Sequence, residues 1–183
     1  MKEICFIDFE TTGTDLIDDY PIEIGAILVD SNMNISKEFH SFIKPNNTFK
    51  LEKTAFDIHG ISELTIMQSP AESTVLRNMF SKLGTSYRLA AWNMSFDVAF
   101  FKTMCLRNSF DEYLNKINYR HLDVQTISFI AKEIGCIPNT INSLSELANY
   151  FGLSRSAHHS AFEDARILYK VYMLLMATMK NKL

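Results

Sequence analysis

The sequence ICFIDFE, residues 4–10, begins as an apolar run and ends with two acidic residues. The run predicts a β-strand from Ile4 to Phe9. Successive side chains of a strand alternate between its faces, so Asp8 and Glu10 point the same way, with Cα atoms about 7 Å apart. Two carboxylates on an apolar strand repel each other and resist burial. Either they bind a hard cation such as Mg²⁺ or Mn²⁺, or they form a frayed strand end in solvent.

Further strands and helices follow this first strand. Strands at 22–29 and 38–43, separated by a turn at 30–34, are expected to form an antiparallel meander with it. Two more strands are predicted at 89–92 and 121–124. Helices are predicted at 69–83, 96–107, from 125 to Gly135, at 143–151 and at 160–179. Three of them start with capping-box patterns, Ser69–Glu72, Ser143–Glu146 and Ser160–Glu163. This order predicts an α/β protein with a mixed five-stranded sheet flanked by helices.

A third acidic residue, Asp97, lies in AAWNMSFDVAFF, residues 90–101. The sequence places it in the first turn of a helix, directly after an apolar strand. A functional role is one interpretation of this position. The other is that the helix dipole favours an aspartate in a first turn whatever its function.

The stretch HHSAFEDA, residues 158–165, combines two histidines with an acidic pair. If Ser160 is the N-cap, His159 stands at N′ and Asp164 at N4, two positions that approach each other across a helix start. His158 then lies on the other side of the chain. The alternative is an exposed histidine beside a first-turn acid, with Glu163 serving only as the capping partner.

Together these residues describe one site, with Asp8, Glu10, Asp97 and Asp164 as oxygen ligands and His159 as a base. Four converging carboxylates repel strongly unless divalent ions are present, and two such ions clamp the attacking and leaving oxygens of a phosphoryl displacement. Histidine titrates near neutral pH and can take a proton from a metal-activated water. The set therefore predicts hydrolysis of phosphodiesters.

Composition limits the function classes. The 183 residues are 47% hydrophobic and 21% charged, typical of a soluble globular protein, and we expect a single domain spanning 1–183. A net charge of −3 supplies no strong field, so polyanion binding must be local or metal-assisted. Three scattered cysteines without a CxxC pattern predict neither a disulfide framework nor a zinc site. No signal peptide or membrane-spanning stretch is apparent, which predicts a cytoplasmic protein without membrane association.

Five motifs occur in order: DFETTG (8–13), IEIGAILVD (22–30), IHGIS (58–62), WNMSFD (92–97) and HSAFEDA (159–165). In this order the chain resembles the DEDDh family of 3′–5′ exonucleases, which includes the proofreading subunit of bacterial replicative DNA polymerase, ribonuclease T and oligoribonuclease. The resemblance runs from Ile4 to about Leu175. It implies a ribonuclease H-like fold and a metal-dependent exonuclease acting on the 3′ end of single-stranded DNA or RNA, with nucleoside 5′-monophosphates as products.

The resemblance also implies residue roles. Asp8, Glu10 and Asp164 would bind a first Mg²⁺ or Mn²⁺, Asp8 would bridge to a second, and Asp97 would assist, while the His-x4-Asp spacing selects His159. The implied substrate contacts are Thr11 and Thr12 beside the terminal nucleotide, with backbone amides near its 3′-OH; His59 at the phosphate or sugar; Asn93 in support; and Phe96 stacked on a base. Alternatively, Thr11–Gly13 is a simple turn and Phe96 a core residue.

A second hypothesis is a proofreading or accessory subunit that acts mainly through association with a polymerase complex. The predicted helix at 165–179 is apolar around much of its circumference, so it is buried in the fold or against a partner. A homodimer is a related possibility. The motifs leave DNA or RNA preference and substrate length open.

Overall fold

The computed structural model describes residues 3–154 and 160–182. Its sheet has the strand order β3-β2-β1-β4-β5. The strands are β1 (Glu3–Thr11), β2 (Pro21–Val29), β3 (Ile35–Phe42), β4 (Tyr87–Ala91) and β5 (Asn118–Asp123). Strands β1, β2 and β3 pair antiparallel, whereas β4 pairs parallel with both β1 and β5. The predicted mixed five-stranded sheet and its antiparallel meander are therefore confirmed.

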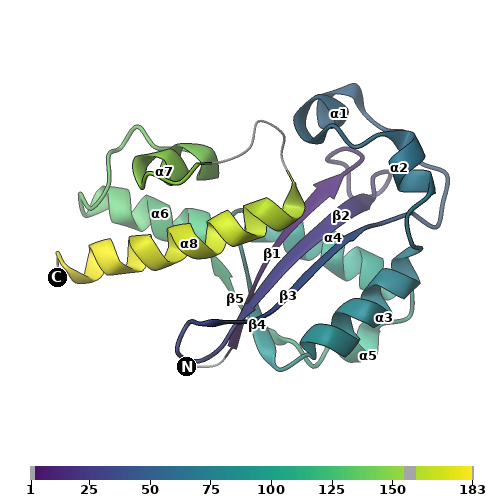
Figure 1. Ribbon diagram of the computed structural model, residues 1–183, viewed down its shortest axis with the longest axis horizontal. Coiled ribbons are helices and arrows are strands. Elements are labelled where there is room, and N and C mark those ends of the chain that lie inside the picture. Colours follow the sequence, from purple (N-terminus) through teal and green to yellow (C-terminus); the bar gives the residue numbers. More distant parts are fainter. Residues whose placement is uncertain (1–2, 155–159, 183) are drawn as a thin grey trace.

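Helices cover both faces of this sheet (Figure 1). They are α1 (Lys53–His59), α2 (Glu63–Met67), α3 (Glu72–Leu83), α4 (Met94–Arg107), α5 (Asp111–Leu114), α6 (Val124–Glu133), α7 (Leu144–Tyr150) and α8 (Ala161–Lys180). One face carries α6, α7 and α8, and the other carries α3, α4 and α5. Among the helices described, none is long and apolar enough to cross a membrane.

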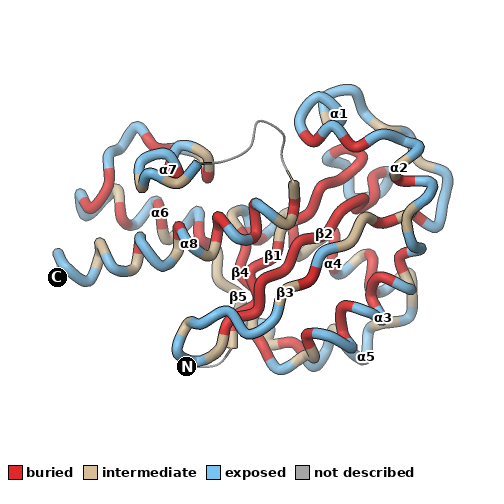
Figure 2. The backbone as a smooth tube through the Cα atoms, viewed as in Figure 1, coloured by how far each residue is buried: buried red, intermediate tan, exposed pale blue. Residues whose placement is uncertain are grey.

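Strand β1 divides the core into two layers. Ile4 and Phe6 belong to the apolar cluster beneath α8, while Cys5, Ile7 and Phe9 belong to the cluster beneath α3 and α4. Both β1 and β2 are buried along nearly their whole length (Figure 2). Because side chains alternate along a strand, Asp8 and Glu10 continue the row of Ile4 and Phe6. Their carboxylates therefore lie on the α8 face.

Several short helices were not predicted from the sequence, namely α1, α2 and α5. Each has seven residues or fewer, too few to show an apolar period, so end signals are all that the sequence offers. Gly60 ends α1 in a left-handed conformation, and the Ser62 hydroxyl caps α2 by accepting the Thr65 amide. These two residues are the signals that would have located both helices.

The three predicted capping boxes have different outcomes. Both halves form at Ser143 and Glu146. At α3 the prediction was wrong, because the helix begins at Glu72 after Ala71 and the Glu72 carboxylate binds another helix instead. At α8 the N-cap is Ser160 as predicted, but its side chain makes no cap bond and donates instead to Glu23 on β2.

Several predicted boundaries also shift; strand β5, for example, begins at Asn118 rather than at residue 121. Strand β3 begins at Ile35 rather than at residue 38, because it pairs with β2 from Val29 onward. Helix α4 begins at Met94 rather than at residue 96, because the Asp123 carboxylate accepts the Met94 amide and Asn93 becomes the N-cap.

Helix α8 comes unusually close to the sheet at Gly25. A Cβ added to Gly25 would lie 2.1 Å from the carbonyl oxygen of Ala161, the first residue of α8. Gly25 pairs with Asp8 in the β1–β2 ladder. The missing side chain therefore lets the first turn of α8 lie directly against the sheet beside Asp8.

We predict that Gly25→Ala lowers the free energy of unfolding by at least about 3 kcal/mol, because the new methyl group meets backbone that moves only with the helix. Urea denaturation measures this. The matched control is Gly152→Ala, where the added Cβ meets nothing within 4 Å and the cost is the left-handed backbone at φ 71°, about 1–2 kcal/mol. Equal losses in the two variants would contradict the steric explanation.

Candidate active site

Three carboxylates converge where β1 meets the first turn of α8. Asp8 and Glu10 come from alternate positions of β1, and Asp164 comes from α8. Ligand oxygens of the three lie within 4.8 Å of one another. Asp164 is buried and its amide donates to the Ser160 carbonyl, which places it at N4 of the helix. The alternation of side chains along β1 and the position of the first turn of α8 together bring Asp8, Glu10 and Asp164 into one group.

The chemistry of this group fits a divalent cation. All three side chains offer carboxylate oxygens, the ligands that hard ions such as Mg²⁺ prefer. At this separation the negative charges repel one another, and partial burial strengthens the repulsion because less water screens it. Binding a cation relieves that repulsion, so the arrangement favours a metal site over a solvated strand end.

Asp97 lies beside this group but not within it. It occupies the first turn of α4, is only 4% exposed, and accepts a hydrogen bond from the backbone amide of Phe9, the residue between Asp8 and Glu10. Burial raises the pKa of Asp97 to about 8, the backbone amides of Phe9 and Asp97 oppose this shift, and the charge of Asp123 adds to it. The structure thus brings the fourth predicted carboxylate to the same strand.

Asp123, which the sequence did not single out, ends β5 next to Asp97. Its carboxylate accepts the Met94 amide at 3.0 Å and the Thr126 amide at 2.7 Å, so it caps the starts of both α4 and α6. An aspartate directly before a helix is a recognisable N-cap signal, because its side chain accepts a backbone amide of the first turn. The double role, however, depends on two helices that are distant in sequence.

A cavity of about 190 Å³ opens on one side of Glu10. Its lining includes Thr11, His59 and Ile58. His59 is buried, and its Nδ1 accepts the Ile61 amide at 2.9 Å. The neutral ring therefore carries its proton on Nε2. The structure thus places two of the predicted substrate-contact residues, Thr11 and His59, next to a metal-ligand candidate.

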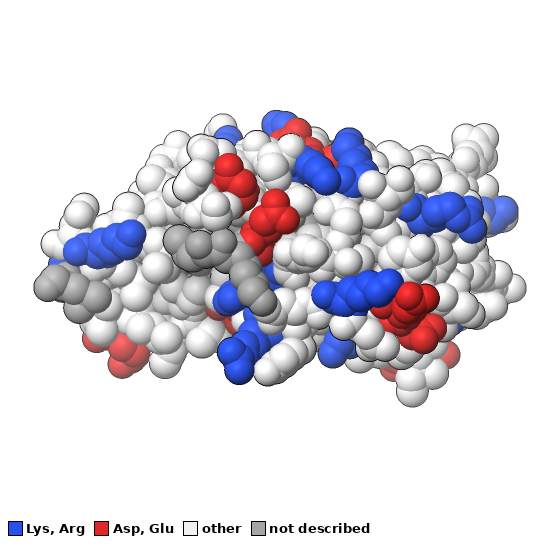
Figure 3. Space-filling model, turned by 90° about the horizontal axis from the view of Figure 1, so that it is seen from below, with Lys and Arg blue, Asp and Glu red and all other residues white. Residues whose placement is uncertain are grey.

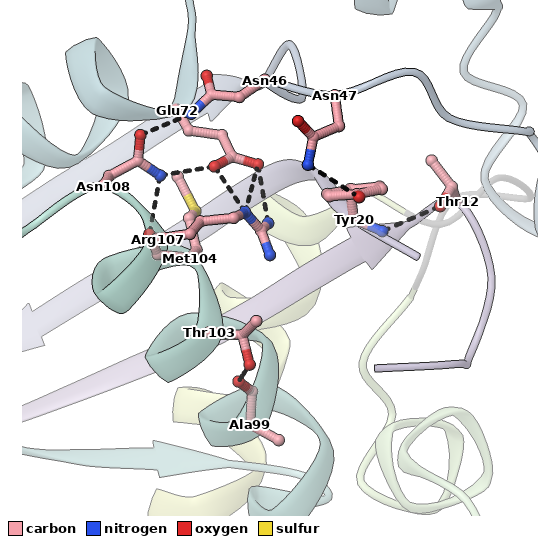
Figure 4. A network of polar contacts seen from close by, with 10 residues as sticks. All are labelled: Thr12, Tyr20, Asn46, Asn47, Glu72, Ala99, Thr103, Met104, Arg107 and Asn108. Carbon is pink, nitrogen blue, oxygen red and sulfur yellow. Dashed lines mark hydrogen bonds and ion pairs between the residues drawn. The ribbon is translucent and has the colours of Figure 1, made fainter. Parts of the chain in front are cut away.

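Thr12 is fully buried and its polar groups are engaged within the protein. Its amide donates to the Tyr20 carbonyl, and its carbonyl accepts the Glu52 amide. Its hydroxyl donates to Asp19 at 2.7 Å. The same hydroxyl accepts the Tyr20 amide at 3.0 Å (Figure 4). We interpret Thr12 as the anchor of the β1–β2 loop, since its amide is bonded to the Tyr20 carbonyl.

The two remaining predicted contacts lie at the start of α4. Asn93 is exposed and its side-chain oxygen accepts the Ser95 hydroxyl. Phe96 is half-buried and its ring packs on Phe100, with centroids 4.8 Å apart. Neither is among the described residues that line the cavities on the two sides of Glu10. Their contact with substrate remains a prediction.

A second cavity, of about 270 Å³, opens on the other side of Glu10 and contains the carboxylate group. Besides Asp8, Glu10 and Asp164 it is lined by Trp92 and by Ser143–Ser145 at the start of α7. The sequence had marked Ser143 only as a helix cap and had given Trp92 no role. Because Glu10 lines both cavities, the carboxylate group in the second cavity adjoins the first.

The histidine prediction falls outside the part of the chain that the structure describes, since this excludes residues 155–159. Ser160 is the N-cap of α8, as the prediction assumed.

A buried ion pair supports the far side of the β1–β2 loop (Figure 4). Glu72 on α3 is fully buried and accepts hydrogen bonds from Arg107 and Asn108 at the end of α4. The Arg107 guanidinium lies over the Tyr20 ring, 4.7 Å from its centroid. Since the Tyr20 amide binds Thr12, this network joins the loop beside the cavity to the two helices behind it.

Comparison with known proteins agrees with this geometry. Residues 5–172 match the RNase T exonuclease family model. The chain is 30% identical to the DNA polymerase III epsilon subunit of Buchnera aphidicola from Schizaphis graminum, over 95% of the chain and 74% of that protein. It is 27% identical to a PolC-type DNA polymerase III of Thermotoga petrophila, over 96% of the chain and 12% of that protein.

A likeness of fold extends to solved structures. A zinc-bound E. coli ExoI–ssDNA complex superposes with a TM-score of 0.83 at 20% identity. The alignment covers all of this chain but 42% of the ExoI chain. The predicted ribonuclease H-like exonuclease fold is confirmed, and the chain belongs to the exonuclease family, within the DEDD class of 3′–5′ exonucleases.

The raised pKa of Asp97 predicts a pH-dependent stability of the metal-free protein. Between pH 3.8 and about pH 8, Asp97 keeps its proton in the folded state but has lost it in the unfolded state. The free energy of unfolding therefore falls as pH rises through this range. Asp97→Asn keeps the acceptor for the Phe9 amide but cannot ionise. In EDTA near pH 8 we expect it to be more stable than the wild type by at least about 1 kcal/mol. Parallel stability curves for the two proteins would contradict the assignment.

Proposed function

We propose that the protein is a metal-dependent exonuclease that removes nucleotides from the 3′ end of single-stranded nucleic acid and releases nucleoside 5′-monophosphates. The convergence of Asp8, Glu10 and Asp164 beside Asp97 carries this proposal. Membership of the exonuclease family supports the reaction class, because phosphodiester hydrolysis is what such a carboxylate group serves.

In this proposal two divalent ions, Mg²⁺ or Mn²⁺, are held by the carboxylates of Asp8, Glu10, Asp97 and Asp164. When bound, such ions lower the pKa of a coordinated water and stabilise negative charge on the reacting phosphoryl group. Asp8, Glu10 and Asp164 would hold one ion, and Asp97 would assist from the start of α4. His159, one residue before the N-cap of α8, accepts the proton of the attacking water.

The hollow beside Glu10 offers a place for the terminal nucleotide. Thr11 lines it with a hydroxyl that donates to the Gly13 carbonyl, and His59 lines it with a ring whose neutral form donates through Nε2. The strand would continue past the carboxylates towards Trp92 and the start of α7. Phe96 and Asn93, at the start of α4, are the proposed further contacts.

Charge favours a single-stranded end over a long duplex. The chain has a net charge of −3, which supplies no strong overall attraction for a polyanion. On the one face that Figure 3 shows, Lys and Arg side chains are dispersed among acidic ones. A duplex-tracking surface needs a continuous basic stripe, whereas an end-binding site draws its affinity from metal ions and stacking. The ExoI–ssDNA complex of the same fold and the polymerase relatives make single-stranded DNA the first substrate to test.

A second candidate function is proofreading or accessory work in association with a polymerase. The relatives support it, because they include an epsilon subunit of DNA polymerase III and a PolC-type polymerase of which this chain matches 12% of the length. Co-purification with a polymerase, without cleavage of free DNA in Mn²⁺, would favour this role over an independent nuclease.

The carboxylates can be tested one at a time. We expect Asp8→Asn, Glu10→Gln and Asp164→Asn each to lower the rate of 3′-end release from labelled single-stranded DNA by more than about 100-fold, because each removes a charged ligand. Circular dichroism checks that each variant folds. Glu112→Gln is the matched control, since Glu112 is exposed on α5 and paired with Lys116. Near wild-type rates in all three site variants would refute the proposed mechanism.

The two adjacent histidines are predicted to differ. His159→Ala should lower kcat by about 10²–10⁴-fold, the usual effect of losing a general base, while His158→Ala should have little effect. Single-turnover digestion with saturating Mn²⁺ measures both. Equal losses in the two histidine variants would refute the choice of His159.

A substrate panel of single- and double-stranded DNA, RNA and dinucleotides, assayed in Mg²⁺ and in Mn²⁺, then defines specificity.

A further inference from the structure

A buried carboxylate that the proposed chemistry does not use lies next to the metal-ligand group. Glu23 on β2 is 1% exposed. Its carboxylate accepts hydrogen bonds from the Ser160 hydroxyl at 3.0 Å, the Ala161 amide at 3.2 Å and the Nε2 of His40 at 2.7 Å. A buried charge is tolerated when donors surround it in this way. Two of the three donors belong to the start of α8.

Glu23 stands directly beside the site in the sheet. It pairs with Glu10 in the β1–β2 ladder, just as Gly25 pairs with Asp8. Paired residues of antiparallel strands project from the same face, so Glu10 and Glu23 both point towards α8. Glu10 joins the metal-ligand group, while Glu23 turns to the backbone of the helix that supplies Asp164.

The body of α8 does not need Glu23 to stay on the sheet. Ile167, Leu168, Val171 and Leu175 bury its apolar side in the core cluster of β1 and β2. The start of α8 carries only the small side chains of Ser160 and Ala161, and the Ser160 side chain makes no cap bond to its own helix. Glu23 therefore governs the position of the first turn more than the attachment of the whole helix.

Strand β3 holds the same turn from the other side. Because the Glu23 carboxylate accepts, the Nε2 of His40 carries the proton and donates. The His40 ring stacks on Phe162, the second residue of α8, with centroids 5.4 Å apart and planes at 28°. This contact resists rotation of the turn about the helix axis, and such rotation would carry Asp164 away from Asp8 and Glu10.

We propose that Glu23, oriented by His40, is a positioning residue for the metal site: it holds the first turn of α8 so that Asp164 meets Asp8 and Glu10. This inference rests on the proposed metal-dependent function. Glu23 is not one of the three clustered carboxylates, and its own carboxylate accepts from His40, Ser160 and Ala161. It acts through the Ser160 hydroxyl and the Ala161 amide, as partners outside a metal's ligands commonly do.

The test compares Mn²⁺ binding, followed by the electron paramagnetic resonance of free Mn²⁺, with steady-state digestion of single-stranded DNA. Glu23→Gln keeps the volume but loses the charge that serves three donors. We expect it to weaken Mn²⁺ binding by about 10- to 100-fold and to lower kcat by a similar factor, with KM for the oligonucleotide within about twofold of wild type. A purely structural role would lower stability without this separation of kcat from KM.

A matched control lies further along α8, where the helix contacts β3. Glu38→Gln breaks the exposed ion pair between Glu38 on β3 and Arg166 on α8, and Mn²⁺ binding should stay within about twofold of wild type. An equal loss of Mn²⁺ affinity in Glu38→Gln would overturn the assignment to Glu23. So would a folded Glu23→Gln variant with wild-type Mn²⁺ affinity and kcat.

Ser160 offers a gentler pair of variants if Glu23→Gln does not fold. Ser160→Ala removes one of the three donors and should weaken Mn²⁺ binding by several-fold, while Ser160→Thr retains the hydroxyl and should restore it. Equal Mn²⁺ affinity in Ser160→Ala, Ser160→Thr and the wild type would overturn the inference. Failure of the wild-type protein itself to bind Mn²⁺ would refute the proposed function instead.

Discussion

The close contact between the first turn of α8 and strand β2 is the constraint on which the rest of the structure depends. Gly25, which pairs with Asp8, leaves room for the Ala161 carbonyl. Glu23, which pairs with Glu10, accepts a hydrogen bond from the Ala161 amide. These contacts place a helix from the end of the chain within reach of the first strand. Without them Asp164 would belong to a helix near the sheet, but not to a group with Asp8 and Glu10.

Negative charge at this edge of the sheet is balanced mainly by helix starts. Glu23 accepts from the first amide of α8, and Asp123 accepts from the first turns of both α4 and α6. The amino ends of helices carry partial positive charge, so each start stabilises a nearby carboxylate. Asp97 shows the limit of this compensation, because burial and the charge of Asp123 still raise its pKa. A nearby cation would lower this pKa again, because it stabilises the ionised carboxylate.

Features of short range were predicted well. The apolar run of β1 and the two-residue period placed Asp8 and Glu10 on one face, and the Ser143–Glu146 capping box forms as its residues suggest. Predictions failed where a side chain had a partner distant in the sequence. Glu72 was expected to cap its own helix but binds Arg107, and the Ser160 hydroxyl was expected to cap α8 but binds Glu23. A buried charged partner outcompetes a local cap because burial strengthens hydrogen bonds to charge.

The sequence by itself determined which carboxylates form the candidate site, the mixed sheet that carries two of them, and the helix position of Asp164. The strand and helix positions depend on periods that act over a few residues, and the ordered motifs are what joined the separate carboxylates into one predicted set. Only the tertiary structure showed that Glu23 and Gly25 seat α8, that Asp123 serves two helices, and that Thr12 is an anchor whose polar groups are engaged. Each of these roles depends on partners that folding brings together from distant parts of the chain, and no local pattern encodes the distance between them.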